Sequence, residues 1–165
     1  MKSDYITRAK KFVEILDAII NAYGIDDIEY GIMEYNYFHR RRIIFSHGLT
    51  RYAFITSDYV IKIDYDLKQI QTFGGCEDEV AIYAQAEKDG MEHLFAKISK
   101  YEFNGVKYYI MPRIKGIEKF PYDADYYMND DEISYIIEKG ICDLHNGNYG
   151  WRNGRVCLID YGAHY

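Results

Sequence analysis

The stretch that decides the fold reads Asp143-Leu144-His145-Asn146-Gly147-Asn148-Tyr149-Gly150 and resumes as Val156-Cys157-Leu158-Ile159-Asp160-Tyr161-Gly162. An acidic residue is followed five positions on by Asn148, and a hydrophobic strand then ends in an Asp-aromatic-Gly triplet. A carboxylate such as that of Asp143 can accept the proton of an attacking hydroxyl group. The side-chain oxygens of Asn148 and Asp160 are hard ligands of the kind that Mg²⁺ prefers. The pattern therefore predicts a metal ion held beside a general base.

A tight turn separates the two halves of this stretch. Asn153-Gly154 lies between them, and an Asn-Gly pair favours a two-residue β-hairpin. Such a hairpin would bring Asn148 and Asp160 side by side on adjacent strands. A surface hairpin that carries ordinary acidic residues is the alternative. We favour the functional interpretation because both halves are present in order.

These motifs resemble the catalytic loop and the metal loop of the protein kinase-like superfamily. The Asp-Leu-His-x-Gly-Asn form is closer to the aminoglycoside phosphotransferase and choline kinase branch than to eukaryotic protein kinases. The resemblance implies an α+β, minimal two-lobed kinase-like fold with an antiparallel N-lobe sheet and a short C-lobe. It implies one domain over residues 1–165, with an N-terminal helix in 1–27, an N-lobe in 28–111, and a hinge and truncated C-lobe in 112–165. In style the compact chain also resembles phage-encoded kinase-like proteins.

The resemblance assigns nucleotide-binding roles to residues earlier in the chain. Gly48 matches the phosphate-covering loop, although that loop has a single glycine here, and Lys62 follows Val60-Ile61 on the strand that carries the phosphate-binding lysine. An edge lysine that faces water is the alternative for Lys62. Glu79 matches the glutamate that pairs with this lysine, with Glu77 as second choice. Stabilisation of the first helical turn by acidic side chains would also explain both glutamates.

The remaining expected site residues lie at the hinge and in the catalytic loop. Met111 is expected beside the adenine, with the Pro112 carbonyl and the Ile114 amide reading its edge. His145 either assists at the γ-phosphate or braces the loop. Because only residues 163–165 follow Gly162, the resemblance also implies that the activation segment is absent and that the phosphate end of the cleft is open.

Composition narrows the partners and the compartment. The chain has 165 residues and only two prolines, which is typical of a folded domain. Its net charge of −6 argues against nucleic acid as the partner. No apolar run is long enough to cross a membrane. The cysteines are not spaced as metal ligands are, and we interpret them as reduced thiols. Because thiols stay reduced in the cytosol, we expect a cytoplasmic protein. ATP, Mg²⁺ and a protein substrate or target are the expected partners, and a homodimer stays open.

Local patterns predict the elements outside the site. Asp4 or Ser3 caps a helix that ends at Gly24, strands occupy residues 28–45 and a hairpin covers 46–63. The triplet Arg40-Arg41-Arg42 is a solvated turn or a patch for an acidic partner. A helix starts near Cys76, and a strand over 94–98 pairs with 106–111. Residues 120–127 form a loop, and a helix capped by Asn129 or Asp130 ends at Gly140.

Three functions are compatible with these residues. The first is an ATP- and Mg²⁺-dependent kinase that acts on a protein hydroxyl group. The second is a kinase-like binding module or inhibitor with little turnover. The third is nucleotidyl transfer, or phosphorylation of a small molecule, by the same residues.

Overall fold

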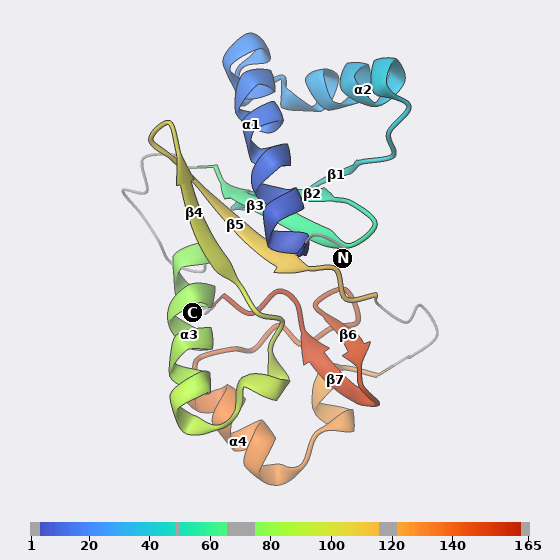
Figure 1. Ribbon diagram of the computed structural model, residues 1–165. Coiled ribbons are helices and arrows are strands. Elements are labelled where there is room, and N and C mark those ends of the chain that lie inside the picture. Colours follow the sequence, from blue (N-terminus) through green and yellow to red (C-terminus); the bar gives the residue numbers. More distant parts are fainter. Residues whose placement is uncertain (1–3, 49, 66–74, 116–121, 163–165) are drawn as a thin grey trace. The chain divides into compact units, whose positions relative to one another are not determined.

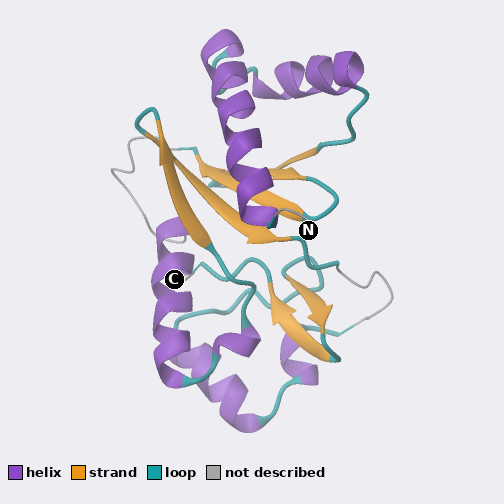
Figure 2. Ribbon diagram, viewed as in Figure 1, coloured by secondary structure: helices purple, strands orange, loops and turns teal. Residues whose placement is uncertain are grey.

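The computed structural model describes residues 4–48, 50–65, 75–115 and 122–162. The α+β class is confirmed, with an antiparallel sheet of five strands and, in the described ranges, four α-helices (Figures 1 and 2). The chain forms two compact units that interleave in sequence. The first contains Met1–Ile70 and Ser99–Arg113, and the second contains Gln71–Ile98 and Ile114–Tyr165. The lobe boundaries predicted from the sequence stay a prediction.

The first unit is built on the antiparallel sheet. Its strands follow the order β1-β2-β3-β5-β4. Their bounds are β1 Ile44–His47, β2 Arg51–Ile55, β3 Tyr59–Asp64, β4 Ser99–Phe103 and β5 Val106–Pro112. Asn104 and Gly105 turn the chain between β4 and β5 with φ angles of 49° and 78°, the left-handed conformation that an Asn-Gly pair favours in a two-residue hairpin.

The strand predicted over residues 94–98 is wrong. A 3-10 turn, η1 (Glu92–Leu94), occupies its start, and the strand that pairs with β5 is β4, five residues further along. Leu94 and Phe95 are buried, and Phe95 forms an isolated bridge with Leu158 in the second unit. The apolar run is therefore a core contact of that unit, which a short hydrophobic pattern cannot distinguish from a strand.

Helix α1 (Tyr5–Tyr23) covers one face of the sheet, as Figure 1 shows. The Asp4 carboxylate accepts the Ile6 amide hydrogen at 3.0 Å, and Gly24 ends the helix with a φ of 78°, so both predicted caps are confirmed. The buried stripe recurs at helical spacing and packs on β3, β4 and β5; it includes Ala9, Phe12, Val13, Leu16, Ile19 and Ile20. Burial of this stripe is the main stabilising contact of the helix.

The strands predicted over residues 28–45 are wrong for most of that range, because residues 28–39 form helix α2 (Ile28–His39). Ile28, Gly31 and Ile32 are the buried positions, and their spacing is helical. A Cβ atom at Gly31 would lie 2.4 Å from the Ile19 side chain, so the glycine lets α2 approach α1 closely. The many aromatic residues favour a strand by propensity, but packing against α1 overrides that preference.

One charged side chain is buried between α1 and the sheet. Asp17 is 4% exposed. Its Oδ1 atom accepts the Tyr108 hydroxyl hydrogen at 2.9 Å, and its Oδ2 atom accepts from Asn104 at 3.0 Å and Asn21 at 3.3 Å. These donors replace the water that the carboxylate loses on folding. Asp17 therefore ties α1 to the β4–β5 hairpin.

The second unit consists of helices and a two-stranded hairpin. Its elements are α3 Cys76–Asp89, η1, η2 Ala124–Tyr127, α4 Asp130–Glu138, β6 Tyr149–Arg152 and β7 Arg155–Leu158. The predicted helices are confirmed, and Asn129 forms a capping box with Glu132 at the start of α4. The predicted loop contains the short turn η2; residues 120 and 121 lie outside the described part. No helix in the described ranges is long and apolar enough to cross a membrane.

Candidate functional site

The hairpin β6–β7 brings the two halves of the motif together. Asn153 and Gly154 form its turn with φ angles of 54° and 77°. Beyond the strand ends, the Asn148 carbonyl accepts the amide hydrogens of Ile159 at 2.8 Å and Asp160 at 3.3 Å. Asn148 and Asp160 are therefore adjacent, as predicted, although both lie just outside the strands rather than in them.

The side chain of Asn148 links this hairpin to the loop before it. It is 7% exposed, and its Nδ2 atom donates to the Asp143 carbonyl at 3.0 Å. Because the amide nitrogen is directed at Asp143, the amide oxygen points elsewhere, and that oxygen is the atom a cation would use. One buried asparagine thus holds the loop of the candidate base against the loop of Asp160.

His145 folds back on its own loop beside Asp143. Its Nδ1 atom accepts the Gly147 amide hydrogen at 2.9 Å, so the neutral ring carries its proton on Nε2. That nitrogen lies 3.4 Å from Asp143 Oδ1, and the two side chains are 56% and 46% exposed. A substrate can therefore reach the Asp143 carboxylate, while the imidazole N–H is directed at it. This geometry favours the bracing role among the two expected for His145.

Gly147 is a site residue that the sequence interpretation missed. A Cβ atom at this position would lie 2.7 Å from Cε1 of His145, which is closer than side chains approach one another. The glycine therefore allows the His145 ring to lie over its own backbone and accept its amide hydrogen. The signal was present as the glycine before Asn148, but its reason is a local contact that no residue pattern displays.

Tyr161 anchors the loop of Asp160 and was also missed. Its amide donates to Oε1 of Glu79 at 3.0 Å, its hydroxyl donates to the Ala96 carbonyl at 2.6 Å, and its ring packs against Phe95. Glu79 is fully buried in the first turn of α3. Burial first, and then the charge of Glu79, raises the pKa of the Tyr161 hydroxyl, so it stays a donor. These contacts hold the backbone on which the Asp160 carboxylate is carried.

The other expected residues are distributed over both units. Lys62 lies in the middle of β3, 5% exposed, between two fully buried isoleucines. A lysine this buried needs an anionic partner, so the alternative of a water-facing edge lysine is wrong. Gly48 is exposed between β1 and β2, and its carbonyl accepts from the Tyr65 hydroxyl. Met111 and Pro112 end β5 in the first unit.

Ile114 belongs to the second unit and packs at the start of β6. A Cβ atom on Gly150 would lie 2.6 Å from the Ile114 side chain and 2.9 Å from the Lys115 carbonyl oxygen. The segment that follows the expected hinge therefore passes directly over the backbone of Gly150, which has no side chain for this reason.

The oxygen donors fit a magnesium ion better than a transition metal. Among the residues the structure describes, no group of three or more His, Cys, Asp or Glu side chains could hold a metal. Mg²⁺ is commonly held by one or two protein oxygens and completes its shell with phosphates and water. An amide oxygen of Asn148 and a carboxylate of Asp160, fixed by the same backbone contacts, match that requirement.

No protein-family model and no curated protein matches the chain. Among solved structures, it is similar to the Legionella pneumophila Lpg2603 kinase bound to IP6, with 17% identity and a TM-score of 0.47, over 77% of this chain and 50% of that one. It is also similar to WbdD, solved with the kinase inhibitor LY294002, with 17% identity and a TM-score of 0.38, over 72% of this chain and 32% of that one. The chain thus spans half or less of these proteins.

Proposed function

We propose that this protein is an ATP- and Mg²⁺-dependent phosphotransferase that acts on a hydroxyl group of a protein. One observation carries the phosphotransferase part of the proposal, namely the hydrogen-bonded unit formed by Asp143, Asn148 and Asp160, and the protein acceptor is the expectation from the sequence. It joins an accessible carboxylate, suited to proton transfer, to a pair of hard oxygen donors suited to a cation. Phosphoryl transfer to a hydroxyl group needs both at one place.

Each residue of the unit has a defined task in the proposed reaction. Asn148 and Asp160 would hold Mg²⁺, which neutralises charge on the phosphates when bound. Asp143 orients the acceptor hydroxyl and takes its proton as the oxygen bonds to the γ-phosphorus and the bond to the β–γ bridging oxygen breaks. His145 directs its N–H at the same carboxylate and so keeps it in position. The resemblance further assigns nucleotide contacts to Gly48, Lys62, Glu79, Met111, Pro112 and Ile114.

The reaction is tested by incubation with ATP labelled at the γ or the α phosphate, with Mg²⁺ and a cell lysate. The proposal expects transfer of the γ label to a protein band and no transfer of the α label. Transfer of the α label would instead identify a nucleotidyl transferase. Label that reaches only small molecules would contradict the protein acceptor, and no transfer from either position would favour a binding module.

Binding and chemistry are separated by three variants of the same loop. Asp143→Asn keeps the shape of the side chain and should preserve Mg-ATP binding while transfer falls by about 10²–10⁴-fold. Asn148→Ala removes a cation ligand and should depress both. Asn146→Ala is the matched control, since Asn146 is an exposed asparagine two residues away, and it should change neither.

Nucleotide binding itself has a thermodynamic signature. Mg-ATP at a hundredfold excess over its Kd should raise the free energy of unfolding by about 2.7 kcal/mol. Asp160→Asn should make that stabilisation insensitive to Mg²⁺. A melting temperature that millimolar Mg-ATP leaves unchanged would contradict the proposed function.

A further inference from the structure

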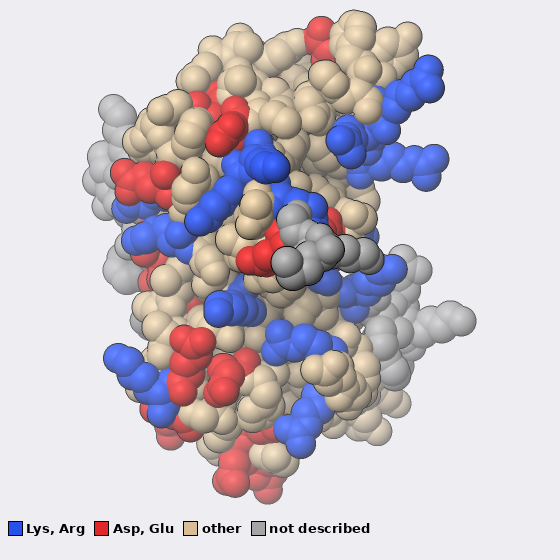
Figure 3. All heavy atoms as spheres, in the orientation of Figure 1, with Lys and Arg blue, Asp and Glu red and all other residues tan. Residues whose placement is uncertain are grey.

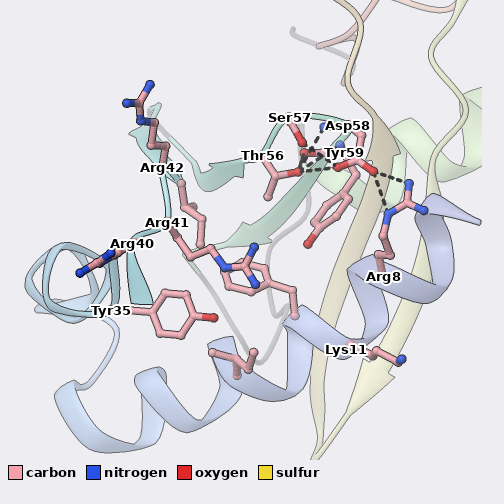
Figure 4. A pocket seen from close by; sticks show the side chains of 13 residues that line it. Arg8, Lys11, Tyr35, Arg40, Arg41, Arg42, Thr56, Ser57, Asp58 and Tyr59 are labelled. Atoms are coloured by element: carbon pink, nitrogen blue, oxygen red, sulfur yellow. Dashed lines mark hydrogen bonds and ion pairs between the residues drawn. The ribbon is translucent and has the colours of Figure 1, made fainter. Parts of the chain in front are cut away.

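The first unit contains a cavity of about 610 Å³ that has no part in the proposed reaction. It lies between α1, the segment after α2 and the turn between β2 and β3 (Figure 4). We call it the arginine cavity. The residues that line it are Arg8, Lys11, Phe12, Ile15, Tyr35, Arg40, Arg41, Arg42, Ile43, Thr56, Ser57, Asp58 and Tyr59. All of them belong to one unit, and the cavity has the size of a small-molecule site.

The chain builds the arginine corner of this cavity with specific contacts. Arg40 ends α2 in the left-handed backbone conformation, with a φ of 50°. Glycine is the usual residue in this conformation, because it has no side chain to cause a steric conflict. The Arg41 amide donates to the Asn36 carbonyl at 3.1 Å. The Asn36 side chain donates to the Ile43 carbonyl at 2.8 Å and accepts its amide hydrogen at 3.1 Å. Hydrogen bonds therefore fix the backbone of this corner, and the three arginines are exposed, as expected for a solvated turn.

The three arginines of the corner differ in direction. Figure 4 shows that Arg41 points into the cavity, whereas Arg40 and Arg42 point away from it. The hydroxyl groups of Tyr35 and Tyr59 point into the same space as the Arg41 guanidinium. Burial first, and then the charge of Asp58, raises the pKa of Tyr59, so its hydroxyl stays protonated and able to donate. One guanidinium and two phenol groups thus converge as donors.

The charge around the cavity is strongly unbalanced. Five Lys or Arg residues border it against one acid, Asp58, although the side chains of Arg40 and Arg42 point away from it; the net charge of the chain is −6. Figure 3 shows blue side chains gathered where α2 leads into β1. Asp58 accepts hydrogen bonds from the Nε and Nη2 atoms of Arg8. Burial alone would raise the pKa of Asp58, but Arg8, Ser57 and Thr56 hold it below its ordinary value, so the pair is neutral and the excess positive charge stays.

The floor of the cavity is apolar and aromatic. Phe12 and Ile15 come from α1, and Tyr35 lies against Phe12 with ring centroids 6.0 Å apart. A ligand that fills this space therefore needs a flat or apolar body as well as an anionic group. Apolar walls with few convergent polar groups are the usual composition of small-molecule sites.

We propose that the arginine cavity binds a small organic phosphomonoester. A guanidinium offers two parallel donors and the two phenols offer one each, which suits the three terminal oxygens of a phosphate better than the two of a carboxylate. The surrounding cations favour the dianion. The phosphate would lie at Arg41, with the organic group against Phe12 and Tyr35. The inference stands independently of the proposed function.

Phenyl phosphate is the probe, titrated calorimetrically into the whole protein in the presence of saturating Mg-AMPPNP. The proposal expects binding that the nucleotide does not weaken. Arg41→Gln should weaken it by about tenfold or more, and Tyr35→Phe by a smaller factor. Arg42→Gln is the matched control, because it removes the same charge from the neighbouring residue that points away, and it should weaken binding by less than about threefold.

Three results would overturn the proposal. The first is no heat of binding from phenyl phosphate at millimolar concentration. The second is competition by Mg-AMPPNP, which would place the phosphate elsewhere. The third is equal weakening by Arg41→Gln and Arg42→Gln, which would mean that the triplet acts only as a general field or compensates the negative end of α2. Circular dichroism of each variant shows whether it is folded. If Arg41→Gln does not fold, Tyr35→Phe still tests the proposal, because it removes one hydroxyl donor and changes no charge.

Discussion

Replacement of Tyr108 by phenylalanine removes one oxygen atom from the buried network around Asp17. Tyr108 is fully buried, and its hydroxyl donates to Asp17 Oδ1 at 2.9 Å. In the variant, Asn104 and Asn21 still donate to Oδ2, so the carboxylate keeps part of its compensation. Oδ1 loses its tyrosine donor at a place that water does not easily reach.

The expected effect is a fall of about 2 kcal/mol in the free energy of unfolding. A hydrogen bond to a charged group contributes about 1.5–3 kcal/mol, and the loss of one oxygen leaves too little space to add a large cavity term. Tyr37→Phe makes the same chemical change on α2 at a side chain that is 81% exposed. That control should change the free energy by less than about 0.5 kcal/mol.

Urea unfolding followed by circular dichroism is the appropriate measurement, because the single tryptophan, Trp151, lies in the second unit. The comparison also has a pH signature. Burial first, and then the hydrogen bond and charge of Asp17, raises the pKa of Tyr108 above its ordinary value of 10.0. Because the pKa of Tyr108 is higher in the folded than in the unfolded protein, its stabilising contribution is complete below pH 10.0 and is lost as the pH rises above 10.0.

The stability difference between wild type and Tyr108→Phe should therefore shrink in alkaline solution above pH 10.0. Equal losses for Tyr108→Phe and Tyr37→Phe would refute the reasoning. A difference that grows with alkaline pH would refute it as well, since it would show that the Tyr108 hydroxyl is easier to ionise in the folded protein.

Three further predictions concern the second unit. Asn129→Ala removes the N-cap of α4 and should lower the free energy of unfolding by about 1 kcal/mol in urea titrations, and an unchanged midpoint would contradict the cap. Burial alone would raise the pKa of Glu132, but the hydrogen bonds from His93 and the Asn129 amide hold it below its ordinary value of 4.5. The ionised Glu132 side chain thus stabilises the fold above pH 4.5, and this contribution is lost in acid. The variant Glu132→Gln retains the capping box, so its melting temperature should depend less steeply on acidic pH than that of the wild type. Parallel plots of melting temperature against pH would contradict this role of Glu132. Gly147→Ala places a Cβ atom 2.7 Å from the His145 ring, so the ring must move. Phosphoryl transfer should fall about tenfold while the melting temperature stays constant. Full activity would show that the position of His145 is irrelevant to the reaction.

Sequence patterns predicted the elements whose signals are local. Asp4, Asn129 and Asn153-Gly154 each act on their immediate neighbours, so the helix starts and the hairpin turn that they mark were found at the correct places. Helix α2 was missed because its aromatic residues favour strands, while the decisive contact is the approach of Gly31 to Ile19 on another helix. Such a contact exists only once both helices are packed.

The candidate site shows the same division. The hairpin signal predicted that Asn148 and Asp160 are adjacent, because a turn of known geometry lies between them, whereas the bond from Asn148 to Asp143 appears only in the structure. The bond from Tyr161 to Glu79 spans 82 positions and has no local signal. The direction of Arg41 was equally invisible, since three consecutive arginines look alike until the backbone is folded. Residue types identified the chemistry, and long-range packing determined its orientation.

The interleaving of the two units matters while the protein is being synthesised. Strand β5 lies between β3 and β4, and its pairing with β3 runs from Tyr59 opposite Pro112 to Lys62 opposite Tyr109. Residues 71–98, which belong to the other unit, leave the ribosome before β5 does. During that interval the nascent chain carries a half-built sheet with an open edge at β3, which can pair with another nascent chain. Synthesis of residues 71–98 therefore lengthens the interval during which the β3 edge lacks its partner β5.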